Sequence, residues 1–141
     1  MGLSANGLNR NGVTAPRWSV GGRIGVMSEL VAPAPTPITP GMVIEELHFM
    51  LEPAEVEQFL DVEGRIWTGF LQTCDGFLRK ETWLPEDEPG KVVVMIWWNT
   101  MAQWKSITPE QCDEVDARMG EWLRPILYFK AHHIARVTEG S

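Results

Sequence analysis

The sequence predicts an α+β fold in which a four-stranded antiparallel sheet carries helices on one face, in the order β-α-β-β-α-β. Three observations predict it. The run 91–98 is rich in β-branched and aromatic residues, as is typical of a buried strand. The run leads directly into a helix-start signal. The segment 53–73 has apolar residues at the three- and four-residue steps of an amphipathic helix.

The first strand is expected from Val43 to Leu51 and the first helix from Pro53 to about Thr73. Pro53 suits the first turn of a helix, and Asp75-Gly76 ends it. In the strand, one face carries Val43, Leu47, Phe49 and Leu51, and the other carries Ile44, Glu46, His48 and Met50.

The second and third strands are expected at Phe77–Leu84 and Lys91–Trp98. The charged turn 85–90 between them is short, so they are expected to pair as antiparallel neighbours. The third strand has apolar residues for both of its faces. One of these sets would form a large exposed patch on a monomer, and monomers avoid such patches. A homodimer that pairs through the open sheet face is therefore expected.

Two Thr-x-x-Gln motifs, at Thr100 and Thr108, predict capped helix starts. The second helix is expected to end at Arg124-Pro125, and the last strand is expected from Leu127 to Val137. With right-handed crossovers, this order of elements gives a ferredoxin-like plait.

Composition narrows the class of function. The net charge is −7, and the part after residue 41 carries −9, which argues against a nucleic-acid or anionic-membrane partner. Cys74 and Cys112 have no zinc-ligand spacing and predict reduced thiols. No run of apolar residues has the length of a membrane span or of a secretory signal, so a cytoplasmic protein is expected.

Residues 1–41 differ from the rest of the chain, because they are rich in Gly, Asn and Pro and lack periodicity. They are interpreted as a disordered extension, and residues 42–138 as the folded domain. Three explanations of the extension remain open. These are a start codon assigned too early, with Met27 or Met42 as the true start, a flexible tail that docks a partner, and an organelle transit peptide.

Several motifs resemble those of a known group. They are Pro53 and Phe59 in the first helix, Asp75-Gly76-Phe77 before the second strand, and Trp98-Asn99-Thr100-Met101-Ala102-Gln103-Trp104 after the third. Together they resemble the dimeric α/β-barrel superfamily of antibiotic-biosynthesis monooxygenases and heme-degrading monooxygenases. A closer resemblance is to an uncharacterised branch known mainly from cyanobacteria. It is carried by Glu45-Glu46-Leu47, Ile66-Trp67-Thr68, Gly76-Phe77-Leu78-x-Lys80-Glu81-x-Trp83 and Trp98-(x)5-Trp104-Lys105-Ser106-Ile107.

The resemblance implies a homodimer and a monooxygenase that needs no bound cofactor or metal. The chain departs from the superfamily where catalytic groups are expected. Ile107 stands at the position of the usual His, and also at the position of the Trp of the heme degraders. Ala117 stands at the position of the His of the heme degraders, so heme degradation of that type is not expected.

The predicted function is monooxygenase-like action on, or binding of, a small hydrophobic aromatic or quinol-type molecule in a pocket between sheet and helices. His48 and Glu46 share a strand face and are the candidate catalytic pair, since a carboxylate can poise an imidazole as a base. Trp67, Trp98 and Trp104 are the candidate ligand-binding residues. The alternative is a non-catalytic module that binds a ligand or a protein, with the proline-rich arm as its tether.

Overall fold

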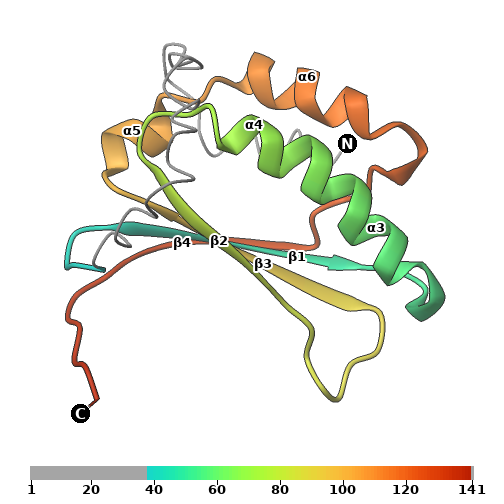
Figure 1. Cartoon of the computed structure of the whole chain (residues 1–141), viewed down its shortest axis with the longest axis horizontal. Helices are drawn as coiled ribbons and strands as arrows, with labels where there is room; N and C mark the ends of the chain where they lie inside the picture. Colours follow the sequence, from blue (N-terminus) through green and yellow to red (C-terminus); the bar gives the residue numbers. More distant parts are fainter. Residues whose placement is uncertain (1–37, 141) are drawn as a thin grey trace, which may run out of the picture.

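The sheet organises the described part of the chain, residues 38–140 of a computed structural model. It has four antiparallel strands in the order β2-β3-β1-β4. The strands are β1 (Val43–Met50), β2 (Phe77–Trp83), β3 (Lys91–Trp98) and β4 (Tyr128–His133). The helices of this part lie together on one face of the sheet (Figure 1). The predicted ferredoxin-like α+β fold is therefore confirmed.

The first helical segment is continuous but changes its geometry along its length. It consists of η2 (Pro53–Glu55), α3 (Val56–Glu63), η3 (Gly64–Thr68) and α4 (Gly69–Leu71). One amphipathic α-helix was expected over this range, whereas η3 is a π-helix. A π turn holds more residues than an α turn, so the apolar faces before and after it are out of step with one 3.6-residue period.

The second helical segment consists of α5 (Met101–Lys105), α6 (Pro109–Met119) and η4 (Gly120–Trp122). The capping box at Thr108 is confirmed, since Thr108 Oγ1 accepts from Gln111 N at 3.1 Å and Gln111 Oε1 accepts from Thr108 N at 3.0 Å. The expected end at Arg124 was too late. Gly120 has a φ of 57°, and this left-handed conformation ends the α-helix after Met119.

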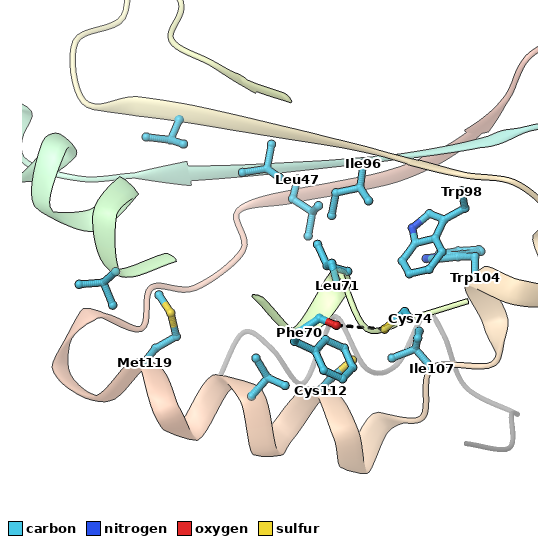
Figure 2. Close-up of a cluster of buried hydrophobic side chains, with 14 of the residues drawn as sticks. Leu47, Phe70, Leu71, Cys74, Ile96, Trp98, Trp104, Ile107, Cys112 and Met119 are labelled. Atoms are coloured by element: carbon cyan, nitrogen blue, oxygen red, sulfur yellow. Dashed lines mark hydrogen bonds between the residues drawn. The ribbon is translucent and has the colours of Figure 1, made fainter. Parts of the chain in front are cut away.

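The main core lies between the helices and the sheet (Figure 2). Alternate residues of β1 and β3 enter it, as their period of two requires. Ile107 is fully buried there, so it is a packing residue of this core. The buried members of this core are Val43, Leu47, Leu51, Phe59, Val62, Phe70, Leu71, Cys74, Val92, Val94, Ile96, Trp98, Trp104, Ile107, Cys112, Val115 and Met119.

The other face of the sheet carries a smaller apolar cluster. Val93, Met95 and Trp97 of β3 are buried there. Ile38 packs against this cluster, and the N–H of Gly41 donates to the carbonyl of Ile134 at 3.0 Å. The segment 38–41 thus contacts the sheet. The rest of the predicted extension, residues 1–37, lies outside the described residues.

Candidate functional site

A small cavity lies in the layer between the helices and the sheet. Its volume is about 40 Å³, which is room for about three water molecules. Most of its lining is apolar, and four side chains bring polar atoms to it: Glu63, Trp67, Asp116 and Arg124. The apolar lining residues are Leu47, Phe49, Phe59, Leu71, Val94, Ile96, Met119, Leu123 and Ile126. We refer to this cavity and its lining as the helix-face pocket.

The π-helix η3 supplies Trp67 to the helix-face pocket. The indole Nε1–H of Trp67 donates to Asp116 Oδ1 on α6 at 3.0 Å. Asp116 is 5% exposed, so this hydrogen bond joins the two helical segments inside the protein. π turns occur often at functional sites, because they redirect a side chain without ending the helix. Trp67 is thus the one candidate ligand-binding residue that lines the pocket.

Glu63, at the end of α3, lines the pocket and is also one member of an ion pair. The Nζ of Lys80 on β2 lies 2.6 Å from each oxygen of Glu63. It also donates to Thr68 Oγ1 at 2.8 Å. The side chains of Lys80 and Glu63 are only 7% and 10% exposed. The two charges are therefore largely shielded from water.

Arg124 lines the pocket from the chain that follows η4. Its guanidinium donates to the carbonyls of Glu121 and Leu123 and pairs with Glu55 at 3.4 Å. The same guanidinium lies 5.2 Å from the centre of the Trp122 ring. Arg124 therefore ties the start of the first helical segment to the end of the second.

Trp98 and Trp104 do not line the helix-face pocket. Trp98 is fully buried, and its Nε1–H donates at 3.1 Å to Glu45 Oε1, which belongs to a fully buried carboxylate. Trp104 is 3% exposed and stacks on Phe129 with ring centres 6.4 Å apart. Both side chains belong to the core (Figure 2). Both side chains therefore pack within the core and outside the helix-face pocket.

His48 and Glu46 lie on the opposite side of the sheet from the pocket. Their side chains alternate along β1 with Leu47, which lines the pocket. Nε2 of His48 lies 2.7 Å from Glu46 Oε2, so the two residues do form a hydrogen bond. Nε2 of His132 on β4 lies 2.8 Å from the other oxygen of Glu46. The candidate catalytic pair and the helix-face pocket are therefore two separate sites within one chain.

The two imidazoles change the acidity of Glu46. Burial raises the pKa of its carboxyl group, but the hydrogen bonds from His132 and His48 and their charges lower it, and the net pKa lies below the usual 4.5. The folded state thus holds this proton less tightly than the unfolded state does. The stabilising contribution of Glu46 is complete above pH 4.5 and is lost as the pH falls through the lowered value.

We expect Glu46→Gln to remove this part of the pH dependence. Urea unfolding of both proteins, repeated at several pH values between pH 7 and pH 3, measures this pH dependence. The stability difference between wild type and variant should be larger above pH 4.5 than at pH 3. Glu86→Gln, in the exposed turn before β3, is the control. A difference that does not change with pH would contradict the expectation.

Sequence reasoning missed Glu63, Asp116 and Arg124 as pocket residues. A signal for the two carboxylates exists. Glu63 follows Phe59 by four residues and Asp116 follows Cys112 by four, and residues four apart share a helix face. Each carboxylate thus stands at a core position of an amphipathic helix. No pattern points to Arg124, because the chain between η4 and β4 is irregular.

Within residues 38–140, no group of three or more His, Cys, Asp or Glu side chains is arranged to hold a metal ion. No helix in the same range has the length and apolar character needed to cross a membrane.

Solved structures provide the comparison with known proteins. A candidate antibiotic biosynthesis monooxygenase from Caulobacter crescentus CB15 is 17% identical, with a TM-score of 0.51, and the match covers 71% of this chain and 93% of that protein. The chain has the fold of the antibiotic biosynthesis monooxygenase-like proteins. This monooxygenase-like fold places its helices over one sheet face, and the helix-face pocket lies in that layer.

Two other matched structures have lower TM-scores. SnoaB from Streptomyces nogalater, a cofactor-independent oxygenase, is 16% identical with a TM-score of 0.47, over 70% of this chain and 96% of SnoaB. A dimeric ferredoxin-like protein from an uncultured marine organism is 13% identical with a TM-score of 0.45, over 72% of this chain and 92% of that protein. No protein-family model and no curated protein matches the chain.

Proposed function

We propose that this chain binds a small hydrophobic aromatic molecule, of the phenol or quinol type, in the helix-face pocket. The observation that carries the proposal is the lining, which is apolar except for a few polar side chains gathered around one space. Pockets for small molecules commonly have this composition, because apolar walls bind the ring and the few polar groups orient it.

The pocket must open to admit a ring. Its volume is about 40 Å³, whereas benzene occupies an engineered cavity of about 150 Å³. Met119 is the lining residue best suited to move aside. Its side chain is unbranched and adopts several rotamers. Binding is therefore expected to be coupled to movement of this side chain.

Two neighbouring residues allow a matched test. Ile126 lines the pocket, and Leu127 is 62% exposed. Ile126→Trp fills the pocket and should weaken phenol binding at least about tenfold, or about 1.4 kcal/mol, whereas Leu127→Trp should leave it unchanged. Isothermal titration calorimetry measures both. Equal affinities in both variants, or no binding by the wild type, would reject the pocket as the binding site.

Catalysis of an oxygenase type is a second candidate function. Asp116 favours it, because this buried carboxylate is held at the pocket by Trp67 and a carboxylate can accept the proton of a phenol. Oxygen uptake with hydroquinone, measured with an electrode against a protein-free blank, tests it. Binding without protein-dependent oxygen uptake would instead support a non-catalytic ligand-binding module.

We also propose that two copies pair through the open sheet face. Val93, Met95 and Trp97 on that face are already buried within one chain, so the exposed side chains beside them carry this proposal. At one end of the face, Met50, Trp83 and Tyr128 are 46%, 48% and 41% exposed. Exposed apolar side chains gathered beside a sheet face are typical of a protein–protein interface.

Sedimentation velocity at micromolar concentration tests this pairing. The wild type is expected to sediment as a dimer and Trp83→Glu as a monomer, because a buried unpaired carboxylate disfavours the interface. Met101→Glu is the control, since Met101 is 44% exposed at the start of α5, on the helix side of the sheet. A monomeric wild type would refute the proposal.

A further inference from the structure

We infer that Glu63, whose carboxylate is paired with Lys80, restricts the helix-face pocket to aromatic ligands that carry a hydrogen-bond donor. The inference rests on the proposed function, because it assumes that the pocket binds a small aromatic molecule. It states which kind of polar group the ligand carries, and it assigns the selection of that ligand to the carboxylate of Glu63.

The ion pair behind the pocket is the first step. Lys80 Nζ lies 2.6 Å from both oxygens of Glu63, with both side chains at most 10% exposed. Shielding two charges from water is unfavourable, and an apolar pair of similar volume is often at least as stable. Packing alone therefore does not account for this pair. Of the two residues, Glu63 lines the pocket and Lys80 does not, so the pair presents its carboxylate member to a ligand.

The second step concerns the orientation of the Glu63 carboxylate. The ammonium of Lys80 donates to both of its oxygens and to Thr68 Oγ1, which uses all three N–H groups of the ammonium. Lys80 is therefore a positioning residue, because it fixes the carboxylate and has no further donor for a ligand.

The third step counts the donors that face the ligand. The only side-chain donor of Trp67 is already engaged with Asp116. The guanidinium of Arg124 uses three of its five N–H groups, on two carbonyls and Glu55. A carboxylate has about four acceptor sites, and Lys80 uses one on each oxygen of Glu63. Neither Trp67 nor Lys80 has a side-chain donor left for a ligand, so a ligand that contacts Glu63 supplies the donor itself.

The polar wall thus distinguishes ligands of similar size. The hydroxyl group of phenol and the amino group of aniline can donate to Glu63. The methyl ether of anisole offers only an acceptor, and benzoate adds a second negative charge beside Glu63. Phenol and aniline are expected to bind more tightly than anisole and benzoate.

Affinities of these four probes for the full chain, measured by calorimetry at pH 7, test the inference. The wild type should bind phenol at least about tenfold more tightly than anisole. The double variant Lys80→Met/Glu63→Leu removes the pair without leaving an unpaired charge, and it should bind the two equally. Glu63→Gln should reduce the ratio, because an amide can donate to the ether. Glu81→Gln, on the open face of the sheet, should preserve it.

Circular dichroism establishes whether each variant is folded. If the double variant does not fold, Glu63→Gln alone still tests the inference. If none of the four probes binds the wild type, the proposed function fails and the inference fails with it. If phenol and anisole bind the wild type equally, the inference fails while the pocket stands. A phenol preference that survives both changes at Glu63 would also overturn the inference.

Discussion

Lys80→Met is expected to lower the free energy of unfolding by about 3–5 kcal/mol. The substitution keeps the apolar length of the side chain but removes the ammonium group. Glu63, whose side chain is 10% exposed, then loses the partner of both its oxygens. Thr68 in the π-helix loses its hydrogen bond as well. An uncompensated shielded charge must then be protonated or hydrated, and both are unfavourable.

Urea denaturation at pH 7, followed by circular dichroism, measures this loss. Lys80→Met/Glu63→Leu should recover most of it, because no charge is left without a partner. The double variant should therefore be more stable than Lys80→Met, and the effects of the two changes on stability are strongly non-additive. Additive losses, or a loss below about 1 kcal/mol for Lys80→Met, would show that the ion pair is better hydrated than its burial indicates.

Trp98→Ala is expected to destabilise the protein by about 3–5 kcal/mol or more. The side chain is fully buried at the end of β3 and contacts Phe77 with ring centres 6.0 Å apart. Its removal leaves a large cavity between the sheet and α5. It also takes one donor from the fully buried carboxylate of Glu45, and this adds to the loss.

Two substitutions separate these contributions. Trp98→Phe keeps most of the apolar volume but removes the indole N–H, so its loss reports mainly on the bond to Glu45. Met101→Ala is the control, because Met101 is 44% exposed on the helix side of the sheet and should lose less than about 1 kcal/mol. Similar losses for Trp98→Ala and Met101→Ala in denaturant unfolding would contradict the assignment of Trp98 to the core.

Much of the fold could be predicted, because its signals are local. The β-branched run of β3, the short turn before it and the Thr108 capping box each involve neighbouring residues. The alternation in β1 also assigned His48 and Leu47 to opposite faces. The π turn could not be predicted in this way, because apolar spacing alone does not distinguish it from an irregular α-helix.

The candidate site was harder to predict. His48 and Glu46 attract attention by residue type, but alternation does not reveal which face of the sheet the helices cover. The pairing of Lys80 with Glu63 joins β2 to α3, and the bond from Trp67 joins the π turn to α6. Such contacts depend on tertiary packing, which a single sequence does not display. They are also the contacts that bring polar groups to the pocket.

The π turn at 64–68 has a consequence for the history of this fold. A π turn is what an α-helix becomes when it absorbs one inserted residue without shifting the register of its ends. Phe59 before the turn and Phe70 after it both remain buried in the core, so both ends keep their docking contacts. Changes of length or residue type within the turn can therefore reshape the pocket wall at Trp67 while the rest of the helix is conserved. The turn is a place where related chains can acquire different ligands with little change to the scaffold.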